Sequence, residues 1–307
     1  MSKLDIIFVD SKKAPQPPPP PPCRPGERSK ERYAKFERLW LDHANELNPL
    51  NSAQGRQRIQ RTLDLINKLT FTKAIDLGCG SGPFLSKLLN KGALVDALDI
   101  SRNALKNLEN QSDTPSCNII QDALPMTGLE DNNYDLVIST DVIADLPSNE
   151  HRLYFSELSR LLTLDGSVIC SSALDVMSVD ALHRFMKLVE TEFCILELQF
   201  SHHRLYQHIQ NLLKMPSKYV EAWNKPSIRH RESEERKGLA KSLFLRMTRR
   251  PYVHIWRALS QLTSPLAKAI EQSDRTLGIL EKASRWLFRE KGISHVIVLG
   301  RRRKIGE

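Results

Sequence analysis

Apolar residues along the chain follow two alternating spacings, which predict strands and helices in turn. Short apolar runs predict strands at residues 74–77, 94–99, 118–121, 134–140, 167–172, 193–200 and 295–300. Apolar positions three or four residues apart predict helices at 83–90, 102–110, 149–162 and 179–190, with Ser101 and Ser178 as N-caps of the second and the fourth. Right-handed helical crossovers between parallel strands place helices on both faces of a sheet. The pattern therefore predicts an α/β fold with a doubly wound, mostly parallel seven-stranded sheet.

The segments outside this alternation define the expected domains. Residues 1–29 contain the proline run 17–22, which predicts a stiff, disordered tail or, alternatively, a ligand for a proline-recognition domain. Residues 30–200 comprise N-terminal helices and the first six strands. Residues 201–293 predict a basic helical insertion, and residues 294–307 predict the last strand followed by a basic tail.

Three helical patterns lie within the insertion, near residues 205–215, 239–262 and 265–290. The second is expected to break at Pro251. The third is expected to begin at Pro265, because proline suits the first position of a helix. A helical unit packed on the edge of the sheet is the simplest expectation.

Charge is distributed unevenly along the chain. The net charge is +9, but residues 1–200 carry −5 and residues 201–307 carry +14. This asymmetry indicates an anionic partner for residues 201–307, which can be RNA, an anionic lipid surface or an acidic carrier protein. A solvated helical cover whose aromatic residues form its core explains the pattern as well.

The cysteines and the apolar runs narrow the class of protein further. The five cysteines lie far apart without metal-ligand spacing, so neither a disulfide framework nor a metal site is predicted. No apolar run has the length of a transmembrane segment, and the N-terminus lacks the order of a signal peptide. We expect a cytoplasmic protein that is peripheral to a membrane at most.

The candidate chemistry begins where the first predicted strand ends. Asp76 closes this strand, glycines follow at 78, 80 and 82, and Pro83 precedes the next helical pattern. Glycine tolerates positive φ and lets a ligand approach the backbone, while a helix N-terminus presents unpaired N–H groups. This strand, turn and helix fit a nucleotide-like or amino-acid-like ligand.

The spacing of the glycines separates two classes of cofactor. A dinucleotide site requires G-x-G-x-x-G, whose third glycine is replaced here by Pro83. The next predicted strand ends in Asp99, at the distance from the loop where an acidic residue contacts ribose hydroxyls in such folds. A dinucleotide is therefore disfavoured, and two carboxylates are expected at one pocket.

At these residues the sequence resembles the class I S-adenosylmethionine-dependent methyltransferases, which have a Rossmann-like fold. The resemblance covers about residues 55–200. It is carried by the AIDLGCGSG loop, the DALDI strand end, the QDA turn at 121–123, the segment from 124 to 139 and the LLTLDG turn at 161–166.

The resemblance implies a cofactor, S-adenosyl-L-methionine, and a set of binding residues. Asp76, Gly78, Gly80 and Gly82 are expected around its methionine part. Asp99 is expected to bond the ribose hydroxyls, Ile100 to pack on the adenine, and Asp122 with Ala123 to meet the adenine amino group. A carboxylate accepts hydrogen bonds from hydroxyl, ammonium or amino donors, which agrees with these roles. A plain surface turn is the alternative explanation for Asp122.

The catalytic group is harder to predict. Asp141 follows the fourth strand, where the family places residues that face the substrate, so we expect it to act as a base or to orient the substrate. Asp145 is a weaker candidate, which a helix N-cap or a solvated loop explains equally well. For His151 a helix surface, and for the pair His202 and His203 a solvated turn, is the preferred explanation over a general base.

The expected function is S-adenosylmethionine-dependent methyl transfer to a small molecule, a lipid or a carrier-bound acyl group. The N/D-P-P-Y/F motif of adenine and glutamine methyltransferases is absent after the fourth strand, where Ser139-Thr140-Asp141-Val142 stands. The alternatives are an RNA methyltransferase that uses the basic insertion, and a scaffold that binds S-adenosylmethionine without catalysis.

Overall fold

The computed structural model describes residues 27–110, 117–174, 179–234 and 236–303. These residues divide into two structural units. Residues 203–287 form one, and the described residues before and after them form the other. The division lies a few residues inside the boundaries expected from the sequence, 201 and 293.

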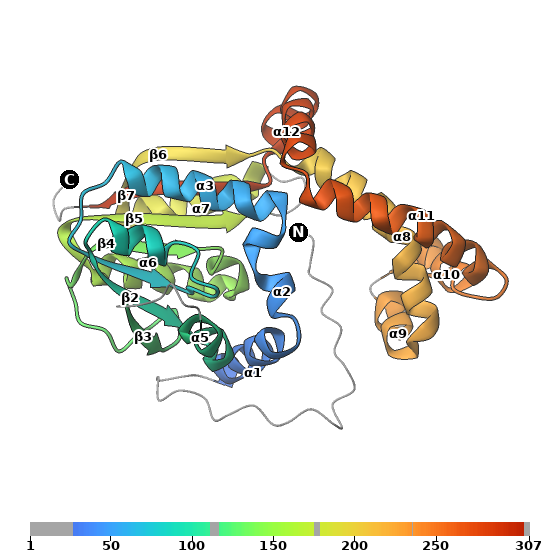
Figure 1. Cartoon of the computed structure of the whole chain (residues 1–307), viewed down its shortest axis with the longest axis horizontal. Coiled ribbons are helices and arrows are strands. Elements are labelled where there is room, and N and C mark those ends of the chain that lie inside the picture. Colours follow the sequence, from blue (N-terminus) through green and yellow to red (C-terminus); the bar gives the residue numbers. More distant parts are fainter. Residues whose placement is uncertain (1–26, 111–116, 175–178, 235, 304–307) are drawn as a thin grey trace. The chain divides into compact units, whose positions relative to one another are not determined.

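A seven-stranded sheet forms the centre of the first unit (Figure 1). Its strands follow the order β3-β2-β1-β4-β5-β7-β6, and only β7 runs antiparallel to its neighbours. The bounds are β1 (Lys73–Leu77), β2 (Leu94–Asp99), β3 (Cys117–Gln121), β4 (Tyr134–Thr140), β5 (Leu162–Ala173), β6 (Phe193–Ser201) and β7 (His295–Arg302). This arrangement confirms the predicted doubly wound, mostly parallel α/β sheet.

The helices of this unit agree with the predicted pattern, apart from shifts at their ends. They are α1 (Glu27–Asp42), α2 (Ala44–Leu47), α3 (Ala53–Asn67), α4 (Leu85–Asn90), α5 (Arg102–Glu109), α6 (His151–Leu161) and α7 (Val179–Glu192). Ser101 caps α5 as predicted, because its Oγ accepts a hydrogen bond from the Ala104 N–H at 3.1 Å. The other predicted cap, Ser178, lies outside the described residues. So does the predicted tail, except that its last residues, 27–29, already belong to α1.

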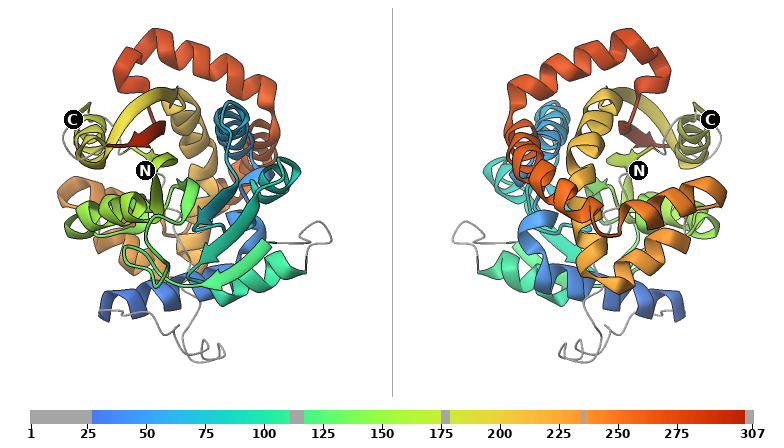
Figure 2. Two further views of the ribbon diagram at one scale, coloured as in Figure 1. Left: turned by 90° about the vertical axis from the view of Figure 1, so that its left-hand side faces the viewer. Right: turned by 90° about the vertical axis from the view of Figure 1, so that its right-hand side faces the viewer.

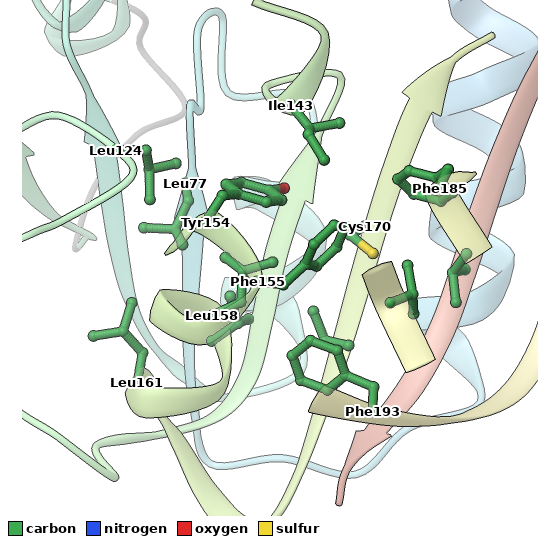
Figure 3. Packing of buried hydrophobic residues seen from close by; sticks show 14 of the residues in the cluster. Leu77, Leu124, Ile143, Tyr154, Phe155, Leu158, Leu161, Cys170, Phe185 and Phe193 are labelled. Carbon is green, nitrogen blue, oxygen red and sulfur yellow. The ribbon is translucent and has the colours of Figure 1, made fainter. Parts of the chain in front are cut away.

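Alternate side chains of the strands enter two separate cores, one on each face of the sheet. Ile75 and Leu77 of β1 pack in a core with Tyr154, Phe155 and Leu158 of α6 (Figure 3). Ala74 of the same strand belongs to the opposite core, which α3, α4 and α5 cover. Because both faces are buried, the strands are apolar almost throughout, as is typical of parallel sheets.

The second unit is entirely helical within its described residues. It contains α8 (Arg204–Asn224), α9 (Pro226–Glu234), α10 (Gly238–Met247), α11 (Tyr252–Gln272) and α12 (Asp274–Phe288), whose last residue lies at the division. Helices α8 and α11 lie side by side (Figure 2). Gln210 of α8 donates to the carbonyl of Ala267 in α11 at 2.9 Å, and Lys214 pairs with Glu271 at 3.0 Å.

The prediction that a helix begins at Pro265 is wrong. Helix α11 continues through Pro265, and the chain breaks at Ser273, between α11 and α12. The sequence signal is overridden because α11 contacts α8 on both sides of the proline. Trp256 stacks on Tyr219 before it, and Ala267 bonds α8 after it. The predicted break before Pro251 is confirmed.

None of the helices in the described ranges has the length and the apolar composition needed to cross a membrane.

A glycine substitution tests the packing of α3. Alanine normally stabilises a helix relative to glycine by about 0.4–1 kcal/mol. At Gly55, however, a Cβ would lie 1.9 Å from the carbonyl oxygen of Pro49, so we expect Gly55→Ala to lower the midpoint of thermal unfolding. Gly278 of α12 is the matched control, because no atom lies within 4 Å of its added Cβ. Gly278→Ala should leave the unfolding midpoint unchanged or raise it. A Gly55→Ala protein with the unfolding midpoint of the wild type would contradict the close contact between Gly55 and the Pro49 carbonyl.

Candidate functional site

The loop after β1 has a backbone that only glycine adopts readily. Gly78, Gly80 and Gly82 have φ angles of 76°, 52° and 67°. The N–H groups of Gly78 and Cys79 donate to the carbonyl of Leu98 at 2.7 and 3.0 Å, which ties the loop to β2. The loop is thereby fixed across the carboxyl ends of two adjacent strands.

The glycines have different neighbours. A Cβ at Gly78 would lie 2.4 Å from Cγ2 of Val142, and one at Gly80 would lie 3.0 Å from the ring of Trp40. Both glycines line a pocket. Gly82 instead faces Leu85 and Leu108, whose side chains a Cβ would meet at 2.8 and 2.5 Å. We therefore assign Gly82 to the packing of the loop on α4 and α5 rather than to the pocket wall.

Asp99, at the end of β2, is a buried carboxylate held by backbone donors. Its Oδ2 accepts from the Gly80 N–H at 3.0 Å, and its Oδ1 accepts from the Ser101 N–H at 2.8 Å. Burial raises the pKa of Asp99 to about 6 despite these hydrogen bonds. Each carboxylate oxygen has a second lone pair, so Asp99 can still accept from a ligand hydroxyl.

Asp76, at the end of β1, is buried even more completely, with 1% of its surface exposed. Its Oδ2 has no hydrogen-bond partner among the described residues. Burial raises the pKa of Asp76 to about 8, and the nearby carboxyl group of Asp99 contributes in the same direction. A buried acceptor without a donor is destabilising unless a ligand supplies one, and an ammonium or amino group would do so.

A pocket opens beside this loop, and its lining is both polar and apolar. Gly78, Gly80, Asp99, Ile100 and Asp122 line it. Apolar residues that also line it are Phe36, Trp40, Leu47, Leu124, Val142 and Leu146. Asp76 is not among the lining residues, but its carboxyl group lies near that of Asp99, which does line the pocket. The carboxylate acceptors, the Asp76 oxygen without a partner and the glycine cradle fit a nucleoside that carries an amino acid.

Asp122 and Ala123 lie at the turn after β3. The Asp122 carboxylate accepts from the Ala123 N–H and from the Gly128 N–H, each at 2.8 Å. Asp122 therefore stabilises its own turn while it lines the pocket, whereas Ala123 is absent from the lining. Both explanations of Asp122, the surface turn and the ligand contact, describe part of its environment.

Helix α1 lies against the same pocket through residues that the sequence did not single out. Arg32 pairs with Glu150 at 2.6 Å and donates to the carbonyl of Leu124 at 3.3 Å. Lys35 pairs with Asp145 at 2.7 Å. Among the aromatic residues of this helix, Tyr33 belongs to the core, whereas Phe36 and Trp40 line the pocket.

Asp141, the predicted catalytic residue, lines the pocket at the end of β4. It has a φ of 62°, and its carboxylate contacts Arg58 Nη1 at 2.7 Å and His295 Nε2 at 2.6 Å. Burial alone would raise the pKa of Asp141, but the charges of Arg58 and His295 outweigh it and hold the pKa well below its usual range. A strongly acidic carboxyl group is a weak base, so the geometry favours orientation of a substrate over proton abstraction.

The weaker candidates have other roles or places. Asp145 lines the pocket but is paired with Lys35. The His151 ring contacts the carbonyl of Leu146 through Nε2 at 3.0 Å, which fixes the loop after β4. His202 and His203 are buried and are not among the pocket-lining residues.

Arg58 and His295 are two further residues near the site that sequence reasoning missed. They lie on α3 and β7, 83 and 154 residues from Asp141. Burial lowers the pKa of His295, whereas the Asp141 carboxylate acts in the opposite direction. No local sequence pattern marks either residue. Each reaches Asp141 only through the tertiary fold, Arg58 from α3 and His295 from β7.

Fold and pocket together define a Rossmann-like domain that binds a nucleoside ligand at the carboxyl ends of its strands. Residues 75–170 match a family model described as a methyltransferase domain. Residues 75–170 therefore match a methyltransferase domain, as the resemblance to the class I S-adenosylmethionine-dependent methyltransferases predicts. The predictions of this family and of its cofactor are confirmed at the level of the domain.

Two curated relatives are both described as "Ubiquinone biosynthesis O-methyltransferase". The relative from Glaesserella parasuis is 25% identical over 149 residues, which are 46% of this chain and 62% of that protein. The relative from Ralstonia nicotianae is 26% identical over 128 residues, which are 40% and 51% of the two chains. The chain thus spans between half and two thirds of the length of these relatives.

Solved structures with a similar arrangement include a putative sarcosine dimethylglycine methyltransferase from Galdieria sulphuraria. It is 16% identical with a TM-score of 0.45, and the match covers 81% of this chain and 86% of that one. N-methyltransferase NodS from Bradyrhizobium japonicum, in complex with S-adenosyl-L-homocysteine, is 16% identical with a TM-score of 0.43, over 56% and 87% of the chains.

The raised pKa of Asp76 predicts how stability depends on pH without added cofactor. The folded protein retains the Asp76 proton up to about pH 8, whereas the unfolded chain releases it above about pH 4. Unfolding between these values therefore releases a proton, and the free energy of unfolding should fall as pH rises from 6 to 8, by at most about 1.4 kcal/mol per pH unit. Chemical denaturation of the wild type and of Asp76→Asn checks this.

Asp76→Asn should flatten the dependence on pH, because the amide does not titrate. Asp64→Asn, an exposed aspartate of α3, is the matched control and should keep the slope of the wild type. Equal slopes for the wild type and Asp76→Asn would show that the buried carboxyl group is ionised throughout this range.

Proposed function

We propose that this protein transfers a methyl group from S-adenosylmethionine to a hydroxyl group of a small apolar molecule or lipid. The mixed lining of the pocket carries the proposal. It combines polar groups that suit a nucleoside with apolar and aromatic side chains that suit an acceptor of low polarity. The description of both curated relatives as O-methyltransferases supports a hydroxyl acceptor.

The residues at the strand ends would hold the cofactor. Asp76, which is buried near Asp99 and does not line the pocket, would offer an unsatisfied oxygen to the ammonium group. Asp99 would offer its remaining lone pairs to ribose hydroxyls, and Ile100 would offer an apolar surface to the adenine. When bound, the sulfonium group would supply an electrophilic methyl group and leave as the neutral thioether, while the hydroxyl proton of the acceptor would pass to solvent. The protein then contributes mainly by orientation, which can lower the barrier of a two-reactant step by about 7–11 kcal/mol in favourable cases.

The acceptor would lie between α1 and the loop after β4. Phe36, Trp40 and Leu146 provide contact area and exclude water. Asp141 stays ionised at neutral pH and can accept a hydrogen bond from the hydroxyl group of the acceptor, which fixes its direction. Arg58 and His295 hold this carboxylate in place and are positioning residues.

Other functions remain open to the same experiment. A carrier-bound acyl group is a further acceptor of the proposed kind, and an RNA acceptor would use the basic residues 201–307. A scaffold that binds the cofactor without catalysis needs no acceptor.

We also propose a cytoplasmic location, in keeping with the four described cysteines, which are all free thiols.

Cofactor binding and methyl transfer are measured in sequence. Titration calorimetry with S-adenosylhomocysteine should show binding by the wild type, and Asp99→Asn should weaken it about tenfold, because a charged acceptor for hydroxyl groups is lost. Asp64→Asn should bind like the wild type. Absence of binding to the wild-type protein would end the proposal.

The acceptor class is then read from labelled methyl transfer into a fractionated lysate. Label in the organic-solvent extract supports the proposal. Label in RNA instead would replace it with the alternative that uses the basic residues. Cofactor binding without any transfer would favour the scaffold.

Asp141→Asn tests the orienting carboxylate. Asparagine tolerates the positive φ of this position, so the backbone should persist. We expect kcat to fall about 10- to 100-fold while affinity for S-adenosylhomocysteine changes less than about twofold. If Asp141 were instead the base that removes the hydroxyl proton, the activity of the wild type would depend on pH through the ionisation of Asp141. A wild-type rate in Asp141→Asn would remove this residue from the mechanism.

A further inference from the structure

Residues 236–270 form a strongly basic part of the second unit. They carry eight lysines and arginines and no aspartate or glutamate. They comprise α10, the turn before α11 and most of α11. Arg246, Arg249 and Arg250 are exposed, and none of them forms an ion pair with another residue in the described ranges. A positive field of this kind attracts an anionic partner.

Exposed aliphatic side chains lie on the same two helices. In α11 they recur at intervals of four, three and four residues, which places them on one helix face. Those of α10 are four residues apart. The six residues, called here the α10–α11 apolar face, are Leu239, Leu243, Ile255, Leu259, Leu262 and Leu266. Leu239 is 90% exposed and Leu262 is 74% exposed, so the described chain leaves them uncovered.

This face is distinct from the one by which α11 packs. Val253 and Ala267 are each 2% exposed and face the interior of the unit. Trp256 stacks on Tyr219 with ring centroids 4.7 Å apart. The helix is therefore anchored without its exposed leucines. An apolar helix stripe accompanied by basic residues is typical of helices that lie at a membrane interface.

We propose that the α10–α11 apolar face docks on an anionic lipid surface. The leucines enter the boundary between headgroups and acyl chains, and Arg246, Arg249 and Arg250 contact lipid phosphates. The docking needs neither a cofactor nor a methyl acceptor, so it holds or fails separately from the proposed function.

The side chains favour lipid over RNA as the anionic partner. Binding of single-stranded RNA uses aromatic rings on which bases stack. Here Trp256 is stacked on Tyr219, and Phe244 is 4% exposed with the Arg236 guanidinium 4.1 Å from its ring centroid. The exposed large hydrophobic residues beside the arginines are all aliphatic. They would gain little from phosphates and much from burial in acyl chains.

Vesicle sedimentation with the full chain tests the proposal. The probes are phosphatidylcholine vesicles with and without about one third phosphatidylglycerol, a fraction that gives a negative surface potential. We expect binding to the anionic vesicles that weakens at about 0.5 M salt, where exposed charges are screened. Equal binding to both kinds of vesicle, or binding to neither, would overturn the proposal.

Two pairs of substitutions separate the apolar contribution from the charged one. Leu259→Ser with Leu262→Ser, and Arg249→Ser with Arg250→Ser, should each weaken binding to anionic vesicles about tenfold or more. These side chains are exposed, so the variants should keep the wild-type circular dichroism and unfolding midpoint. Binding that either pair leaves unchanged would contradict the docking.

Matched controls come from the first unit. Leu153 and Leu164 are 50% and 65% exposed, and Arg184 and Lys187 of α7 are exposed. The pairs Leu153→Ser with Leu164→Ser, and Arg184→Ser with Lys187→Ser, should bind vesicles like the wild type. Loss of binding in these controls would show nonspecific attraction. Retention of a single-stranded RNA probe without vesicle binding would assign the basic residues to nucleic acid.

Discussion

Two carboxyl groups buried at adjacent strand ends constrain the rest of this site. Asp76 and Asp99 lie at the carboxyl ends of β1 and β2, and burial raises the pKa of both. Asp99 is satisfied by backbone N–H groups, which requires the loop to turn its donors inward at Gly80. Asp76 has one oxygen without a donor in the described structure. The burial of Asp99 therefore explains why the loop presents its N–H group at Gly80. The burial of Asp76 explains why a ligand with an ammonium or amino group would suit the site.

The parts that the sequence predicted are those encoded by local patterns. Apolar runs of strand length and apolar positions at helical spacing identified the sheet and its flanking helices, because burial on both faces leaves a continuous signal. The glycines after Asp76 identified the ligand loop, since their positive φ excludes most other residues. Asp99 and Asp141 were expected near one another because β2 ends at Asp99 and Asp141 follows β4, and both line the pocket.

The parts that were missed depend on contacts between distant segments. His295 reaches Asp141 only because β7 enters the sheet beside β5 and runs antiparallel to it, so that the start of β7 meets the end of β5. Arg58 lies on α3, a helix that precedes β1 and the glycine loop in the chain. Pro265 shows the same limit in the second unit, because contacts with α8 carry α11 through a residue that usually starts a helix.

The distribution of charge gives the two halves of the chain opposite tasks. Residues 1–200 are net acidic and contain the pocket, which suits a cofactor with a sulfonium and an ammonium charge; residues 201–307 are net basic and contain the apolar face. An apolar methyl acceptor also concentrates in lipid. A protein that carries a lipid-docking surface beside a catalytic domain would therefore meet its acceptor where that acceptor accumulates, which links the two proposals without making either depend on the other.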